Sequence, residues 1–119
     1  MLAGVFLFIL PLMVVAAPAP SVTIPPTDYN AFKTVIQFPA HADPIAFEKA
    51  FIAECIKEAK VSQDYYIESK WYWQKGAGGK NLLTQATCYC INFLKTGVWD
   101  ELTYSVAGDL GAAIVLPDD

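Results

Sequence analysis

The sequence predicts an α+β fold in which two helices cover one face of an antiparallel sheet. Three observations support this prediction. A strand runs directly into an amphipathic helix over residues 32–60, two alternating stretches flank a glycine-rich turn, and a weaker helical pattern follows near the C-terminus. With a weak or truncated last strand, the predicted order is β-α-β-β-α-β, which is the ferredoxin-like, or split βαβ, arrangement.

The first strand and helix are predicted over residues 32–60. Alternating side chains from Phe32 to Phe38 indicate a strand, and Pro39 ends it because proline has no N–H to donate. Asp43 is a good N-cap, and Pro44 suits the first helical position. An apolar stripe at helical spacing predicts the buried face of the helix. Its members are Phe47, Phe51 and Cys55, widened by Ala50, Ile52, Ile56 and Ala59.

Two further strands are predicted over residues 65–74 and 82–94, where side chains alternate and the first stretch is rich in aromatic residues. The glycine-rich stretch 75–80 between them predicts a hairpin connection. A second helix is predicted from a periodic set that begins at Trp99, and residues 112–116 predict the short last strand. The periodic set is Trp99, Leu102, Val106 and Leu110.

The N-terminal residues 1–16 are predicted to be a secretory signal peptide. They are almost wholly apolar and end at the small residue Ala16, which suits cleavage. The alternative is a membrane anchor through residues 1–17, but Pro11 interrupts this run and it is shorter than the roughly 20 residues that span a bilayer. We therefore expect a secreted protein without stable membrane insertion after cleavage.

Residues 17–30 are rich in proline and are predicted to be an extended linker, so the domain is expected to cover residues 31–119. The formal net charge is −4, and all eight basic residues are lysines. Because the chain has neither arginine nor a lysine cluster, nucleic acid is not an expected partner.

Three cysteines leave two alternatives open. Either all three are buried thiols, or a disulfide joins Cys55 to Cys88 or Cys90. A bridge between Cys88 and Cys90 is not expected, because residues two apart on one strand lie near the upper distance limit for a disulfide. The sequence holds one histidine, His41, and no CxxC motif, so neither a metal site nor a cofactor is expected.

The sheet is expected to have one bare face. Both helices fall on the same side by the right-handed crossover rule, and the other face would expose a row of aromatic and aliphatic side chains. Soluble monomers rarely expose such a patch. Because two identical chains can bury it by face-to-face pairing, we expect a homodimer.

Two stretches resemble a known family. TVIQFPAHADPIAFEKAF, residues 34–51, and the tail WDELTYSVAGDLGAAIVLPDD, residues 99–119, resemble dimeric α/β-barrel proteins, particularly the EthD-like group. The resemblance spans most of residues 32–118 and rests on element order and apolar positions. It implies a dimeric barrel with a cavity for an aromatic or polyketide-like ligand. The chain departs from the family by placing Glu54 where the family has a helix histidine, and by ending at the turn before the family's last strand.

Candidate site residues follow from these predictions. Histidine is a common general acid or base, and Glu54 takes the family's histidine position, so His41 and Glu54 are candidate catalytic groups, although each is alternatively a solvated surface residue. A ligand cavity is expected to be lined by polar and aromatic residues of the first two strands, and the same aromatics would suit a dimer interface. These residues are Gln37, Tyr66, Glu68, Lys70 and Tyr72.

Two functional hypotheses remain. The leading one is a secreted, EthD-like protein that binds a small apolar or aromatic ligand and acts on it if it is catalytic. The alternative is a non-enzymatic secreted effector or surface-interaction protein. A closed pocket containing Glu54, Tyr66 or His41 would favour the first hypothesis, whereas a flat, filled sheet face would favour the second.

Overall fold

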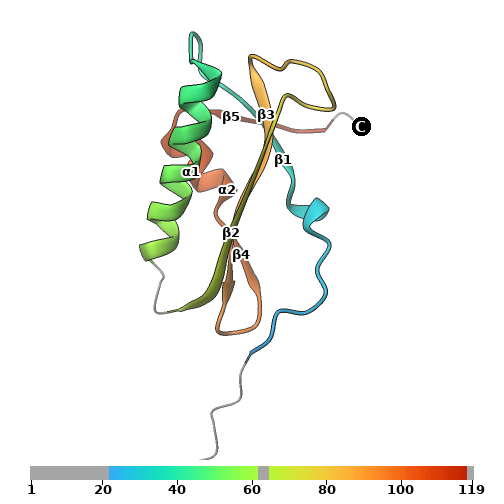
Figure 1. The fold of residues 1–119 in the computed structure, drawn as a ribbon, viewed down its shortest axis with the longest axis vertical. Coiled ribbons are helices and arrows are strands. Elements are labelled where there is room, and N and C mark those ends of the chain that lie inside the picture. Colours follow the sequence, from blue (N-terminus) through green and yellow to red (C-terminus); the bar gives the residue numbers. More distant parts are fainter. Residues whose placement is uncertain (1–21, 62–64, 118–119) are drawn as a thin grey trace, which may run out of the picture.

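The computed structural model describes residues 22–61 and 65–117. These residues form an α+β domain, which confirms the predicted class (Figure 1). The elements are η1 (Tyr29–Phe32, a 3-10 turn), β1 (Thr34–Gln37), α1 (Pro44–Val61), β2 (Tyr66–Lys75), β3 (Gln85–Leu94), β4 (Trp99–Glu101), α2 (Thr103–Asp109) and β5 (Ala113–Val115). The predicted signal peptide, residues 1–16, lies outside the described residues. Of the described helices, neither is long and apolar enough to cross a membrane.

The strands join one open antiparallel sheet in the order β2-β3-β1-β5, and β4 also pairs with β3. One side of β3 pairs with β2 along nearly its whole length. Its other side pairs first with β1 and then with β4. Without β4, the order is compatible with the predicted ferredoxin-like arrangement. The short β5 agrees with the expected weak last strand.

The prediction that a helix begins at Trp99 is wrong. Residues 99–101 form β4, in which Trp99 pairs with Phe93, and α2 begins only at Thr103. The Trp99 ring packs against the Phe93 ring with centroids 5.1 Å apart. The contact with Phe93 therefore holds the indole in the sheet. This packing favours a strand at Trp99, although the helical spacing of the sequence had predicted a helix there.

The face of the sheet covered by α1 and α2 carries the apolar core. Helix α1 begins as predicted, because the Ala46 N–H donates to the Asp43 carboxylate at 3.1 Å. Its buried residues include Phe47 and Phe51, and the Phe51 ring lies 5.2 Å from the Trp73 ring of β2. The predicted stripe packs on the sheet through Phe47, Phe51, Cys55 and Ala59, whereas the prediction that Ile56 lies on the buried face is wrong, because Ile56 is 43% exposed.

A disulfide joins Cys55 of α1 to Cys90 of β3. The interpretation that all three cysteines are thiols is wrong, because the Cα atoms of Cys55 and Cys90 approach to 5.8 Å, within disulfide range. Cys88 is free and buried, so the expectation that it is not bonded to Cys90 is confirmed. The disulfide ties the longer helix to an interior strand of the sheet.

The opposite face of the sheet is partly covered by the chain's own N-terminal segment, residues 22–32, which we call the aromatic strap (Figure 1). The strap is extended up to η1. Its Tyr29 and Phe32 rings lie against Tyr89 and Trp99, with centroids 5.6–6.4 Å apart. Residues that were expected to be a linker therefore pack on the sheet.

The side chains beneath the aromatic strap are buried without help from a helix. Tyr89, Ile91 and Phe93 alternate along β3, and each is at most 5% exposed. The Trp99 indole N–H adds a hydrogen bond to the Thr27 hydroxyl at 3.3 Å. Much of the aromatic surface that was expected to require a second chain is therefore hidden within one chain, and the homodimer stays a prediction.

Candidate functional site

The predicted ligand-binding residues fall on both faces of the sheet. A β-bulge shifts the register of β2 against β3 between Tyr66 and Glu68. Tyr66 pairs with Leu94 and Glu68 with Phe93, and these two partners are neighbours that point to opposite faces. The expectation that Tyr66 shares a face with the others is therefore wrong. The residues on the open face, away from the helices, are Gln37, Glu68, Lys70 and Tyr72.

The open-face aromatic residues are already engaged within the chain. Tyr72 stacks on Tyr89 with ring centroids 5.4 Å apart. The Lys33 Nζ lies 4.6 Å from the Tyr72 ring centroid, and the Lys70 Nζ lies 4.6 Å from that of Tyr29. Burial raises the pKa of Tyr89, and the neighbouring Tyr29 and Tyr72 raise it further. These residues form a cation-capped aromatic layer in which the rings pack against one another.

The two candidate catalytic residues lie apart. His41 is exposed in the loop before α1, with a backbone φ of 67°. Glu54 lies ten positions after Pro44, at about 1.5 Å of helix rise per residue. Pro44, where the helix begins, and Glu54 are therefore about 15 Å apart along the helix axis, and His41 lies in the loop before Pro44. The structure does not combine them into an acid–base pair.

Glu54 instead belongs to a group of carboxylates between the two helices. Oxygens of Glu54, Glu58 and Asp109 lie within 4.8 Å of one another. The Ser105 hydroxyl donates to Glu58 at 2.8 Å, and the Lys57 Nζ lies 3.9 Å from Glu54. Sequence reasoning missed this group because it joins residues from α1 and α2. Three carboxylates could contribute to a hard-cation site, and the Glu58 Oε2 atom is buried without a hydrogen-bond partner among the described residues.

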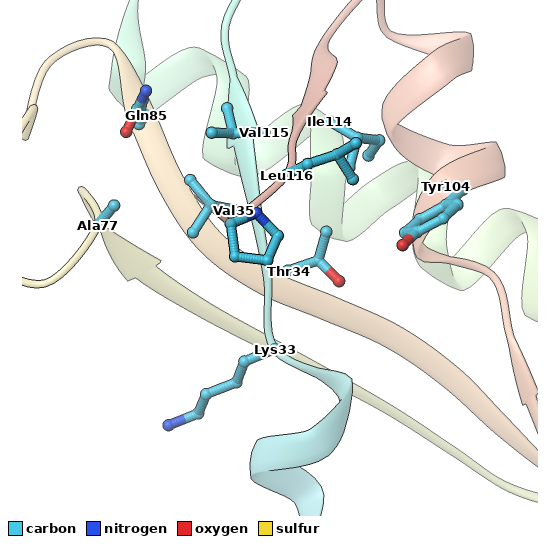
Figure 2. A pocket seen from close by; sticks show the side chains of 10 residues that line it. Lys33, Thr34, Val35, Ala77, Gln85, Tyr104, Ile114, Val115 and Leu116 are labelled. Carbon is cyan, nitrogen blue, oxygen red and sulfur yellow. The ribbon is translucent and has the colours of Figure 1, made fainter. Parts of the chain in front are cut away.

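A different part of the molecule contains a cavity of about 380 Å³. Its walls come from β1, β5, α2, the start of β3 and the loop after β2, as Figure 2 shows. It forms because β5 pairs with β1 only as far as Val35, after which Leu116 and Pro117 leave the edge of β1 uncovered. The described lining residues are Lys33, Thr34, Val35, Ala77, Gln85, Tyr104, Ile114, Val115, Leu116 and Pro117.

The cavity is mostly apolar, with a few polar groups. The Thr34 hydroxyl donates to the Phe32 carbonyl at 3.1 Å, and the Gln85 amide donates to Gln37 at 2.8 Å. Tyr104 is exposed and presents its hydroxyl at the wall (Figure 2). Lys33 extends away from the apolar side chains in Figure 2, toward the Tyr72 ring. Tyr104 therefore supplies a hydroxyl at the wall, whereas the Lys33 ammonium lies over the Tyr72 ring and would have to turn from it to meet a bound molecule.

Sequence reasoning placed the ligand residues on the wrong part of the sheet. None of the five predicted residues lines this cavity, although Gln37 supports it through Gln85. The one available signal was Pro117, which ends the last strand and separates the tail from its neighbour. A second, more open hollow of about 280 Å³ lies between the start of α1 and Leu110, and its described lining does not include His41.

Comparison with known proteins identifies no relative. No family model matches the sequence, and neither the curated proteins nor the solved structures contain a significant match. The resemblance to EthD-like proteins therefore stays a prediction.

Proposed function

We propose that the protein is a non-enzymatic binding protein for a small, largely apolar molecule that carries an acidic group. The observation that carries this proposal is the cavity between β1 and β5, with Lys33 and Tyr104 among its walls. Its size falls within the range of about 300–1,000 Å³ that is usual for small-molecule sites. Apolar walls with a few polar groups are also usual for such sites.

The lining residues support binding rather than catalysis. The described residues of the cavity include no histidine, cysteine, aspartate or glutamate, so a nucleophile with an adjacent base is missing from the described walls. His41 and Glu54 lie elsewhere. The acidic group on the ligand is inferred from Lys33, because its ammonium is the one cationic group among the described lining residues.

Secretion remains part of the proposal. The Cys55–Cys90 disulfide supports an oxidising compartment, because structural disulfides are rare in reducing ones. A dimeric barrel made by face-to-face pairing receives less support. The aromatic strap already covers Tyr89 and its neighbours on the face that a partner would need.

Decanoate and decanol, which share a ten-carbon chain, test this proposal by isothermal titration calorimetry. We expect decanoate to bind about tenfold more tightly than decanol, a difference of about 1.4 kcal/mol. Lys33→Gln should remove that preference, whereas Lys95→Gln, a charge-matched change in the turn between β3 and β4, should keep it. Val115→Trp should abolish binding of both probes by filling the cavity. Undetectable binding to the wild type, or unchanged binding to Val115→Trp, would contradict the proposal.

A further inference from the structure

Strand β2 forms one edge of the sheet, and its outer side is unpaired among the described residues. It is ten residues long, whereas β5 at the other edge has three. Long unpaired edges are sites where another strand can add, and natural proteins usually protect them. Here apolar side chains lie along the edge, because Ile67 and Trp71 are each 44% exposed.

Helix α1 extends this apolar surface. Glu54 and Glu58 belong to the flank of α1 that faces α2, since they group with Asp109. At 100° per residue, Ile52 and Ile56 lie on the opposite flank, which is the one nearer β2. Ile56 is 43% exposed. The exposed apolar residues at this edge thus come from both the helix and the strand.

The sequence of β2 is complementary to itself. Residues 67–71 read Ile-Glu-Ser-Lys-Trp, so antiparallel pairing of two copies centred on Ser69 sets Glu68 opposite Lys70 of the other copy. By residue count the same register sets Ile67 opposite Trp71, and Ile67 is the bulged residue between Tyr66 and Glu68. Opposite charges and aromatic–aliphatic pairs both stabilise directly paired strands. Glu68 and Lys70 lie on the open face, whereas Trp71 pairs with the disulfide-bonded Cys90 and lies on the helix face.

We propose that two copies of this chain pair antiparallel through β2, about a twofold axis at Ser69. The second copy is favoured over another partner because this register pairs Glu68 with Lys70 twice and brings the exposed Ile67 and Trp71 of both copies to the same edge. The pairing joins the two sheets into one continuous sheet and sets both copies of α1 on the same side of it. The apolar residues of the two edges then cover each other.

This dimer differs from one made by apposed sheet faces. The β2 edge is the edge of the sheet away from the cavity between β1 and β5, and it meets the aromatic strap through Lys70, whose Nζ lies over the Tyr29 ring. Edge pairing therefore leaves the proposed ligand site open. Failure of ligand binding would say nothing against the dimer, and a monomeric protein would say nothing against the ligand site.

Charge reversal tests the register. Sedimentation velocity over a dilution series should show the wild type as a dimer with a measurable dissociation constant. Glu68→Lys sets lysine against Lys70 twice and should raise that constant at least tenfold. Lys70→Glu should also raise it, although this change removes the contact of Lys70 with Tyr29 as well. The double variant Glu68→Lys/Lys70→Glu restores opposite charges and should recover most of the wild-type affinity.

Trp71→Glu provides a second test and should give monomers, whereas Leu83→Glu, at an exposed residue between β2 and β3, should leave the dimer intact. Circular dichroism verifies that each variant is folded. If Trp71→Glu does not fold, the exposed charge variants still decide the question. A monomeric wild type at high concentration would overturn the proposal. A dimer that survives every edge change would also overturn it, as would a double variant that dimerises no better than the single variants. Pairing of β2 with a different protein is compatible with a monomeric wild type and with neither of the other two results.

Discussion

The two faces of the sheet bury aromatic side chains beneath different covers, which are the helices on one face and the aromatic strap on the other. On the first, α1 lays Phe47 and Phe51 over the strands and is joined to them by the Cys55–Cys90 disulfide. On the second, an extended segment with a single 3-10 turn supplies Tyr29 and Phe32. The first cover is regular and covalently attached, whereas the second is held by ring contacts and side-chain polar contacts.

This difference should make the two covers unequal in strength. A helix forms its backbone hydrogen bonds internally, so its side chains are free to pack on the sheet. The disulfide adds stability by restricting the unfolded chain. The aromatic strap has neither advantage and lies near the start of the chain. We therefore expect perturbations of the helix face to unfold the whole domain, and perturbations of the strap to loosen one face.

Removing the disulfide should have the largest effect. The sequence separation of 35 between Cys55 and Cys90 predicts that Cys55→Ala/Cys90→Ala lowers the free energy of unfolding by about 4 kcal/mol. Urea denaturation measures this loss, and reduction of the wild type should reproduce it. Cys88→Ala keeps the disulfide and should cost about 1 kcal/mol. A double variant as stable as Cys88→Ala would show that the covalent tie does not distinguish the helix face.

Truncating the aromatic strap should have a smaller effect. Phe32→Ala and Tyr29→Ala each remove ring contacts with Tyr89 and Trp99, and each should cost about 1–3 kcal/mol. Hydrogen exchange should rise at β3 and β4 while α1 stays protected. Tyr65→Ala, at an exposed tyrosine, is the matched control and should be nearly neutral. Equal deprotection of α1 would mean that the two covers form one cooperative unit.

The buried thiol should have an effect that appears only at high pH. Burial raises the pKa of the Cys88 thiol from 9.0 to about 12. The unfolded chain therefore loses this proton first, and stability is full below pH 9 and falls as the pH rises toward 12. Between pH 8 and 10.5 the expected loss from this group is about 2 kcal/mol.

Comparing the wild type with Cys88→Val isolates the contribution of the Cys88 thiol to the pH dependence of stability. The lysines and tyrosines titrate in both proteins, so their effects cancel in the comparison. Its free energy of unfolding should decline less steeply than that of the wild type across the same pH range. Parallel curves would contradict the raised pKa. At pH 8, alkylation of native Cys88 by iodoacetamide should proceed only as fast as the domain opens.

The sequence predicts those parts of the fold that depend on periodic patterns. The Phe47, Phe51 and Cys55 positions of α1, its Asp43 cap, and the alternation of β3 and of β2 from Glu68 onward place side chains where the structure has them. One alternative for the cysteines, Cys55 to Cys90, is also correct. Each of these depends on neighbours within a few residues or on one repeating spacing.

The remaining features depend on contacts that no local pattern encodes. Trp99 enters β4 because Phe93 and the aromatic strap surround it, although its spacing is helical. The strap has no periodicity, so its proline-rich sequence indicated a linker. The cavity arises where Pro117 leaves the sheet, far from the residues chosen for ligand binding. The prediction for Tyr66 is wrong because the β-bulge between Tyr66 and Glu68 shifts the side-chain alternation, and the alternating sequence pattern does not reveal a bulge.

The aromatic strap also has a consequence for the order of folding. Thr27 and Trp99, which form its hydrogen bond to the sheet, are 72 positions apart. The hairpins of β2 with β3 and of β3 with β4 close much shorter loops and form first, since long loops cost more entropy to close. During synthesis the strap emerges early but has no complete docking surface until Trp99 has left the ribosome. Its docking is therefore a late step, and until then Tyr89 and Trp99 stay open to solvent and to chaperones.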